Sequence, residues 1–437
     1  MASPLSDEFV LPTNKDIGAA DHPQPDAICT YLCGNSLGPL SKRSKALVEQ
    51  ELHAWGTRAV TGHFSTHPYG RGWVDFCDHI TPLFADLVGA KEKEVACMGT
   101  LTANLHLMMD SFYKPTPERY KILCEARAFP SDQYAFASQA LAHGFDPAQA
   151  VLEISPRPGE YTLREQDILD IIAQEGSSIA LVIFSGVQYY TGQWFPMQSI
   201  TRAAQAQGSI CGWDLAHAVG NVPLSLHDWG VDFAVWCTYK YVNAGPGSIA
   251  GLYVHEKWKE TMLPKFAGWW GHDPSTRFAM PPKFSPIEGA QGFQQSNPSI
   301  LGAASLLGSL QIFKEAGMMQ PLRERSVQLT AALEELLMQS KYFVSAPEAP
   351  TRQSDKPAFT IITPTDPDSR GAQLSLLFLP NGVMQSVHDA LTSLGVIGDE
   401  RKPDVIRLAP APLFNTLKDC EQGALLLERV LDNLAWI

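Results

Sequence analysis

Val231-Asp232-Phe233-Ala234-Val235-Trp236-Cys237-Thr238 is the stretch that decides the fold class, because its apolar residues predict a buried strand that ends in Tyr239-Lys240. The next residues, Asn243-Ala244-Gly245-Pro246-Gly247, can continue neither a strand nor a helix. Lys240 is therefore expected at the carboxyl end of a strand, where open α/β sheets place their chemistry.

A second predicted strand, residues 209–213, ends upstream in Asp214. A lysine and an aspartate at two strand ends are typical of a pyridoxal-phosphate site, in which the lysine supplies the Schiff base and the aspartate pairs with the pyridine nitrogen. Trp236 and Tyr241 surround Lys240 with apolar groups, which disfavours its charged form. From these residues alone, two ordinary alternatives stay open: a solvated surface lysine and an aspartate that caps a helix.

The rest of the chain alternates short apolar runs with amphipathic segments, which indicates βαβ units and a mostly parallel, doubly wound sheet. The runs predicted as strands are 121–124, 181–184, 209–213, 233–238 and 249–254. Past residue 298 the pattern changes to helices around 303–313, 322–338, 385–394 and 418–434, with strands at 359–362 and 405–408. The sequence thus predicts an α/β protein with a smaller α+β domain appended to the main one.

We expect three parts in the chain. Residues 1–55 form an N-terminal segment that packs on the small domain and includes a helix around 46–55. Residues 56–310 form the large cofactor-binding domain, and residues 311–437 form the small C-terminal domain.

The composition of the chain argues against several classes of function. The 437 residues are 45% hydrophobic and 18% charged, as in a globular protein, and the net charge of −13 argues against nucleic-acid binding. The 8 cysteines are scattered without a C-x-x-C pair, so neither a metal nor a disulfide framework is expected. The opening residues lack a signal-peptide pattern and no run is long enough to span a membrane, so we expect a cytoplasmic protein.

Several loop-to-helix junctions offer donors for a phosphate. They are the stretch 99–104, the stretch 129–132, where Ser131 or Asp132 could cap the following helix, and the strand-end hydroxyl of Ser185. A plain Thr-capped helix stays open as the alternative at 99–104. No Walker A sequence and no G-x-S-x-G elbow occurs, and the glycines at 245–251 have the wrong spacing for a dinucleotide loop.

Long motifs make the chain resemble the kynureninase family over nearly its whole length. They are Tyr31-Leu32-Cys33-Gly34-Asn35-Ser36-Leu37-Gly38, Phe129-Pro130-Ser131-Asp132-Gln133-Tyr134, the stretches 184–192 and 213–240, Gly268-Trp269-Trp270-Gly271-His272, Ser296-Asn297-Pro298 and Arg407-Leu408-Ala409-Pro410. The resemblance implies a fold-type-I pyridoxal-phosphate enzyme of the transferase-like α/β architecture. It also implies a homodimer with shared active sites, acting in tryptophan catabolism and NAD biosynthesis.

The resemblance assigns cofactor roles residue by residue. Lys240 matches the Schiff-base lysine, Asp214 the partner of the pyridine nitrogen, and Phe129 the residue that stacks on the ring. The other cofactor contacts that it implies are Leu101, Thr102, Pro130, Ser131, Asp132, Ser185, His217, Tyr239, Trp269 and Asn297. Of these, Trp269 and Asn297 would reach the active site of the neighbouring subunit.

The implied reaction is hydrolysis of L-kynurenine or L-3-hydroxykynurenine to an anthranilate and L-alanine. Arg407 matches the arginine that grips the substrate carboxylate, while His63 and Asn297 match residues near its aromatic ring. Tyr239 is either a proton donor near the carbonyl or a phosphate ligand. One departure from relatives is the stretch 64–72, which is longer and lacks their proline before Trp73.

Two other classes of pyridoxal-phosphate protein fit the sequence less well. A cysteine desulfurase-like lyase needs a thiol on a loop of the small domain, where the only cysteine is Cys420 in the terminal helix. A cofactor-binding regulator without turnover would have no reason to keep Arg407 and His63.

Overall fold

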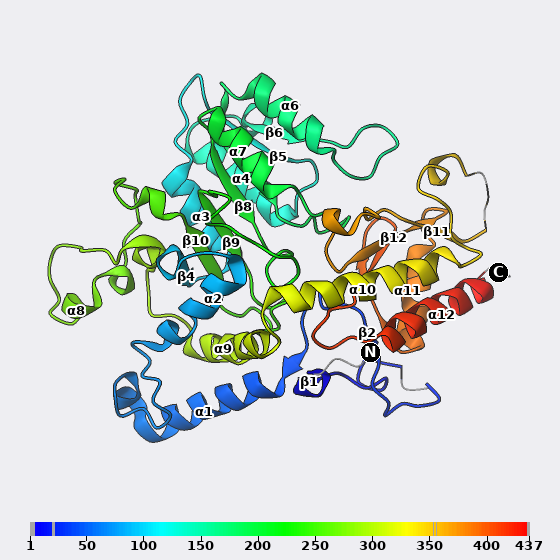
Figure 1. The fold of residues 1–437 in the computed structure, drawn as a ribbon, viewed down its shortest axis with the longest axis horizontal. Coiled ribbons are helices and arrows are strands. Elements are labelled where there is room, and N and C mark those ends of the chain that lie inside the picture. The colour runs from blue at the N-terminus through cyan, green and yellow to red at the C-terminus, as the bar shows by residue number, and fades with distance from the viewer. Residues whose placement is uncertain (1–4, 20–21, 353, 355, 435–437) are drawn as a thin grey trace.

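The computed structural model of the chain describes residues 5–19, 22–352, 354 and 356–434. Two sheets lie side by side along the long axis of the molecule, joined by the long helix α10 (Met319–Met338) (Figure 1).

The larger sheet has seven strands in the order β4-β10-β9-β8-β7-β5-β6. Their bounds are β4 (Val95–Cys97), β5 (Lys121–Glu125), β6 (Val151–Ile154), β7 (Ile179–Ser185), β8 (Ile210–Asp214), β9 (Phe233–Trp236) and β10 (Gly251–Val254). All neighbours from β9 to β6 pair in parallel, whereas β10 runs antiparallel to both β9 and β4. The predicted mostly parallel sheet is confirmed.

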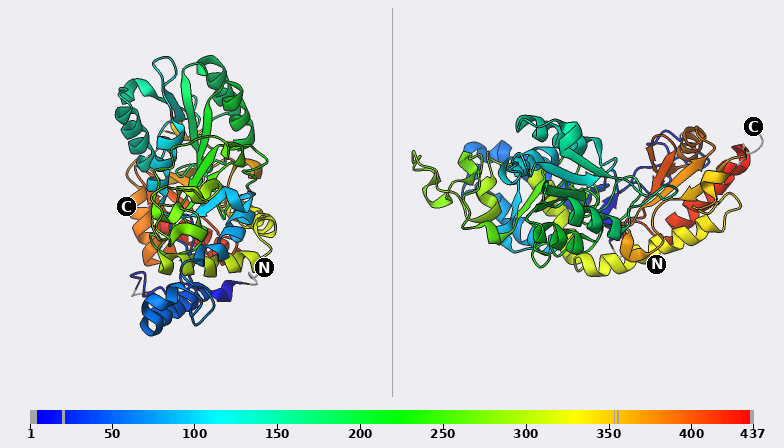
Figure 2. Two further views of the ribbon diagram at one scale, coloured as in Figure 1. Left: turned by 90° about the vertical axis from the view of Figure 1, so that its left-hand side faces the viewer. Right: turned by 90° about the horizontal axis from the view of Figure 1, so that it is seen from above.

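Helices cover both faces of this sheet (Figures 1 and 2). They are α2 (Thr81–Val88), α3 (Leu101–Phe112), α4 (Pro130–Ala142), α5 (Pro147–Ala150), α6 (Glu165–Glu175) and α7 (Met197–Ala206). Side chains alternate along β9, so that Phe233 and Val235 enter one hydrophobic core and Ala234 and Trp236 the other. A strand buried on both faces explains the continuous apolar run in the sequence.

The predicted strand around Lys240 was too long. β9 ends at Trp236, because the Thr238 hydroxyl donates to the Ile249 carbonyl at 2.6 Å and the Ala244 N–H donates to the Thr238 carbonyl at 2.9 Å. These bonds turn the chain away from the sheet, so Lys240 lies in a turn just past the strand end.

The smaller sheet has the order β11-β12-β15-β14 and is antiparallel throughout. Its strands are β11 (Ala358–Ile361), β12 (Leu374–Leu379), β14 (Asp399–Arg401) and β15 (Val405–Leu408), and it packs with α11 (Met384–Ser393) and α12 (Leu417–Leu434). Strands β12 and β14 were not among the predicted ones.

The N-terminal residues reach both halves of the molecule. β2 (Thr30–Tyr31) pairs with β13 (Val396–Ile397), β1 (Phe9–Val10) pairs with β3 (Leu40–Ser41), and α1 (Lys42–Arg58) packs along α9 (Ile300–Glu315). Gly308 allows this close approach, since a Cβ there would lie 2.6 Å from the Ser44 Cα. A short helix, α8 (Pro274–Arg277), lies at the end of the molecule away from the smaller sheet, at the left of Figure 1. Among the described helices, none combines the length and hydropathy of a membrane span.

Candidate active site

A pocket opens at the carboxyl ends of β7 and β8 and at the starts of α3 and α4. It brings together most of the residues predicted from the sequence. They are Leu101, Thr102, Phe129, Ser131, Asp132, Ser185, Asp214, His217, Tyr239 and Lys240, joined by Val187, Tyr189 and Ala216.

Lys240 is half-buried and lies against a histidine. Its Nζ lies 2.8 Å from His217 Nε2 and 5.8 Å from the centre of the Phe129 ring. Burial lowers the pKa of Lys240, and burial together with the Lys240 charge holds the pKa of His217 well below its usual range. The imidazole is therefore neutral and accepts a hydrogen bond from the lysine amine, while its buried Nδ1 has no partner among the described residues.

Asp214 lies beside a second carboxyl group. Its Oδ1 accepts the Ala216 N–H at 2.7 Å, and its carboxyl contacts that of Asp132. Burial raises the pKa of both groups, most strongly for Asp132, which also feels the charge of Asp214. Asp132 Oδ1 has no hydrogen-bond partner among the described residues. The Lys240 charge favours the ionised form of these two buried acids, and a cationic ring nitrogen at this place would add to that effect.

Two helix starts face the pocket without side-chain caps. Thr100 precedes α3 and Phe129 precedes α4, and neither side chain accepts a capping hydrogen bond. The capping roles considered for Ser131 and Asp132 are wrong, because both lie inside the first turn of α4 and face the pocket instead. The hydroxyls of Ser131 and Thr102 lie 3.0 Å apart. Free N–H groups of two helix starts beside two hydroxyls suit a phosphate.

These features fit pyridoxal phosphate. The uncapped helix starts would hold its phosphate, the half-exposed Phe129 ring would cover its ring, Asp214 would face its nitrogen and Lys240 its aldehyde carbon. Pro130, as the first residue of α4, fixes the turn that presents Phe129. The Tyr239 phenol keeps its proton, since burial raises its pKa.

Arg407 does not line this pocket. The side chain is fully buried, pairs with Asp399, and donates from Nη1 to the Tyr189 carbonyl at 2.6 Å. Its Nε has no partner among the described residues. The hydrogen bond from Nη1 links the guanidinium to Tyr189, which lines the pocket, and the Arg407 charge contributes to the lowered pKa of Lys240.

His63, Trp269 and Asn297 also lie outside the Lys240 pocket. A chain of ring contacts links the first two: Trp269 to Phe278 at 5.4 Å, Phe278 to Phe64 at 5.8 Å and Phe64 to His63 at 6.2 Å. Asn297 lines a neighbouring cavity of about 670 Å³ that contains Gly99 and Thr100. Within one chain, the structure does not bring these three residues to Lys240.

The stretch 64–72 is tied to α1 through the buried carboxylate of Glu51. Glu51 accepts hydrogen bonds from His67 Nε2 at 2.8 Å, Arg71 Nη2 at 2.8 Å and Trp73 Nε1 at 2.9 Å. The His63 ring packs edge-on against Trp73 at 4.9 Å, so these bonds also fix where His63 lies.

Sequence reasoning missed Glu125, which accepts the Ser185 hydroxyl at 2.5 Å. The predicted strand ended at residue 124, one residue too early, because β5 continues through Glu125. The signal that identified Asp214 and Ser185, a polar side chain at the end of a buried strand, would have found it.

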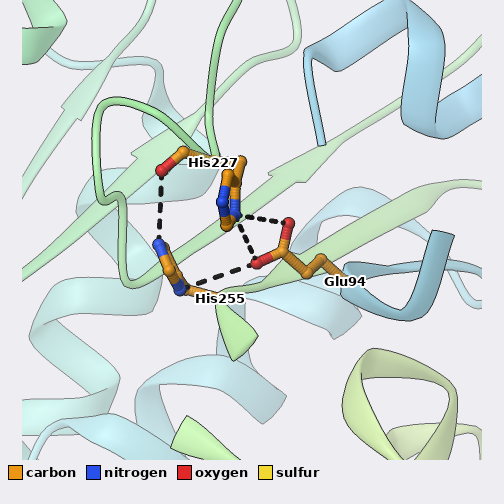
Figure 3. Close-up of side chains that lie close together, drawn as sticks. All are labelled: Glu94, His227 and His255. Carbon is orange, nitrogen blue, oxygen red and sulfur yellow. Dashed lines mark hydrogen bonds and ion pairs between the residues drawn. The ribbon is translucent and has the colours of Figure 1, made fainter. Parts of the chain in front are cut away.

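A separate cluster joins Glu94, His227 and His255 at the opposite edge of the sheet (Figure 3). Among the described residues, their side-chain ligand atoms form the one set close enough to hold a metal, all within 4.8 Å. However, His255 Nδ1 already accepts the Lys257 N–H at 3.0 Å, and the two rings are stacked with planes 28° apart. Stacked rings do not aim their nitrogens at one point, so the cluster is a hydrogen-bonded clamp.

The fold and the pocket define a pyridoxal-phosphate enzyme of fold type I. Residues 41–366 match the aminotransferase class-V family. Among solved structures, C-DES with glycine covalently linked to its pyridoxal-phosphate cofactor has a TM-score of 0.73 at 17% identity, covering 92% of this chain and 96% of that one. A cysteine desulfurase from Thermococcus onnurineus has a TM-score of 0.71 at 16% identity, covering 93% and 95%. These low identities support the fold alone.

Sequence relatives are more specific. The kynureninase of Yarrowia lipolytica is 50% identical over 90% of this chain and 91% of its own length, and that of Saccharomyces cerevisiae is 49% identical over 98% and 97%. Residues 322–427 match the kynureninase C-terminal domain. The chain belongs to the kynureninase family.

Proposed function

We propose that this protein hydrolyses L-kynurenine, L-3-hydroxykynurenine or both, giving anthranilate or 3-hydroxyanthranilate and L-alanine, as part of tryptophan catabolism. The observation that carries the proposal is the Lys240 pocket, which contains the acids, amine and uncapped helix starts that a pyridoxal-phosphate lyase needs, in a chain about half identical to kynureninases.

The cofactor, when bound, supplies an electron sink for a carbanion next to the substrate amine. Lys240 would hold the cofactor and, once its amine is free, remove the proton from the substrate Cα, a role suited to an amine whose pKa burial lowers. His217 orients that amine through Nε2. Asp214 keeps a proton on the ring nitrogen, because a carboxylate stabilises the charge there.

The substrate carboxylate is assigned to Arg407. Its Nη1 would exchange the Tyr189 carbonyl for the carboxylate, while Asp399 holds Nη2. Tyr239 has two candidate roles, proton donor near the γ-carbonyl and phosphate ligand.

A homodimer is part of the same proposal, and it accounts for His63, Trp269 and Asn297. These residues lie away from the Lys240 pocket of their own chain, and apolar side chains such as Trp55, 63% exposed, and Met280, 66% exposed, lie on the surface of the single chain. A second copy would cover this surface and receive the three residues in its own pocket. We also propose that each subunit consists of an N-terminal segment, residues 1–55, a large cofactor-binding domain, residues 56–310, and a small C-terminal domain, residues 311–437. The described cysteines are free thiols, which supports a cytoplasmic location.

A desulfurase activity is disfavoured by the cysteines. Cys420 is fully buried in α12, and burial raises the pKa of its thiol to about 12, so it cannot act as a thiolate on a loop.

The test is a steady-state assay of purified protein with kynurenine and 3-hydroxykynurenine, quantifying the anthranilate and alanine formed. Native protein should bind pyridoxal phosphate with a visible absorbance that borohydride abolishes, and peptide mapping should place the reduced adduct on Lys240. Lys240→Ala should lose the adduct and turnover. Equal release of alanine by Lys240→Ala would contradict the assignment.

A further inference from the structure

Adjacent parallel strands β5, β7 and β8 end in polar side chains at the same edge of the sheet: Glu125, Ser185 and Asp214. Ser185 lies directly opposite Asp214 in the register of β7 and β8. Ser185 and Asp214 line the Lys240 pocket, whereas Glu125 lies behind Ser185 and does not. Glu125 is therefore placed to act on the pocket through Ser185.

Glu125 is only 3% exposed, and its carboxyl group is bonded to Ser185. It accepts the Ser185 hydroxyl at 2.5 Å and, from the same residue, the backbone N–H at 3.3 Å. Within the described part of the chain, no lysine, arginine or histidine forms an ion pair with it. The titratable groups that face it are Asp214 on β8, Asp132 on α4 and Tyr189 on the loop after β7.

This environment disfavours a negative charge on Glu125. Burial raises its pKa to about 7, an effect that the Ser185 hydrogen bonds oppose and the charge of Asp214 reinforces. Glu125 also borders a second cavity, of about 590 Å³, together with Arg127, Tyr189 and Lys402. Both protonation states are therefore populated near neutral pH, and this cavity lies beside the carboxyl group.

The protonation state of Glu125 determines what Ser185 can offer. A serine hydroxyl has one hydrogen and two lone pairs. When Glu125 is ionised, that hydrogen is donated to the carboxylate, and Ser185 can only accept a hydrogen bond in the pocket. When Glu125 is protonated, the acid can donate to Ser185 Oγ, and the serine hydrogen is released toward the pocket.

We propose that Glu125 is a positioning residue of the cofactor pocket whose protonation decides whether Ser185 accepts or donates a hydrogen bond to the bound pyridoxal phosphate. The inference rests on the proposed cofactor site and adds a residue that acts on it from behind. Because a hydrogen bond to the cofactor changes its electronic state, the absorbance of the bound cofactor should report the switch.

The experiment is a pH titration of the visible spectrum of the holoenzyme between about pH 6 and pH 8. Native protein should show a spectral transition near the pKa of Glu125, about 7. Glu125→Gln cannot ionise, so we expect bound cofactor whose transition is abolished or moved by more than about one pH unit. Ser185→Ala, which keeps Glu125 but removes the hydroxyl, should lose the same transition.

The matched control is Glu153→Gln, an exposed carboxylate on the neighbouring strand β6, which should titrate as the native protein does. A Glu125→Gln holoenzyme with the native titration would overturn the inference. Should Glu125→Gln fail to fold, Ser185→Ala decides alone, and an unchanged transition there would overturn it equally. Native protein that binds no cofactor would instead contradict the proposed function itself.

Discussion

Two opposing effects act on the pKa of the Lys240 amine. Burial lowers its pKa, while Asp214 and Asp132 nearby raise it, and the neutral His217 accepts its hydrogen bond. An amine that loses its proton easily can attack a carbonyl and later serve as a base. The same two carboxyl groups would stabilise a cationic ring nitrogen, so the electrostatics of the pocket suit a protonated pyridine ring.

Tyr239→Phe separates the two roles left for this phenol. If Tyr239 is a phosphate ligand, the variant should bind pyridoxal phosphate about tenfold more weakly, with little change in kcat at saturating cofactor. If Tyr239 is a proton donor, the variant should have a kcat that is lower by about 100-fold or more, with its cofactor affinity retained. Cofactor titration and steady-state kinetics on one preparation distinguish them. A variant with native kcat and native affinity would remove Tyr239 from both roles.

Arg407→Lys should raise KM for kynurenine by about tenfold or more, because a lysine keeps the charge but cannot bind a carboxylate through two parallel hydrogen bonds. Cofactor absorbance should stay native, since Arg407 does not line the Lys240 pocket. Arg401→Lys is the control, as Arg401 pairs with the same Asp399 at 2.7 Å. If Arg401→Lys raised KM as much as Arg407→Lys, the effect would belong to Asp399 and not to carboxylate binding.

At the residue scale, the sequence predicts which side chains end buried strands but not how neighbours modify them. Asp214 and Lys240 follow long apolar runs, so their place was predictable. The contact between Asp132 and Asp214 joins α4 to β8, and the hydrogen bond from Arg407 to the Tyr189 carbonyl joins β15 to the loop after β7. Such contacts depend on tertiary packing, for which local sequence has no signal.

At the scale of elements, Glu94 connects three segments that precede or follow strands. It accepts the N–H groups of Lys91 at 2.9 Å and Glu256 at 2.8 Å, and its oxygens lie 3.0 and 3.2 Å from His227 Nδ1 (Figure 3). Glu94→Gln loses the charge that strengthens these bonds and should cost about 2 kcal/mol of unfolding free energy. Thermal or urea denaturation measures it. The exposed Glu92→Gln should change stability little, and equal losses in both variants would contradict the clamp.

Strand and helix identities were largely predictable, whereas ends and directions were not. The apolar run before Lys240 continues past the strand, because Thr238 uses its hydroxyl to close a turn. The run at 249–254 has the composition of its parallel neighbours, yet β10 is antiparallel, since the link from β9, residues 237–250, forms no helix that would carry the chain back across the sheet. Direction depends on the length and path of the connection rather than on the strand residues.

At the scale of the whole molecule, the candidate site is divided between two places. Lys240, Asp214 and the phosphate-binding groups share one pocket, while Trp269 and Asn297 lie elsewhere on the chain. If both sets serve one reaction, two copies must meet with these surfaces together. A twofold dimer would then contain two equal sites, each built from both chains.

Mixing two inactive variants tests this arrangement. Lys240→Ala should inactivate the pocket of its own chain, and Asn297→Ala should inactivate the pocket of the partner chain. In a mixed dimer, the chain with intact Lys240 receives an intact Asn297 from its partner, so one native site is restored. Random reassortment of equal amounts gives half mixed dimers and hence about a quarter of native activity. If Asn297 instead serves its own chain, every site in the mixture carries one defect, and activity after reassortment should stay at the level of the separate variants.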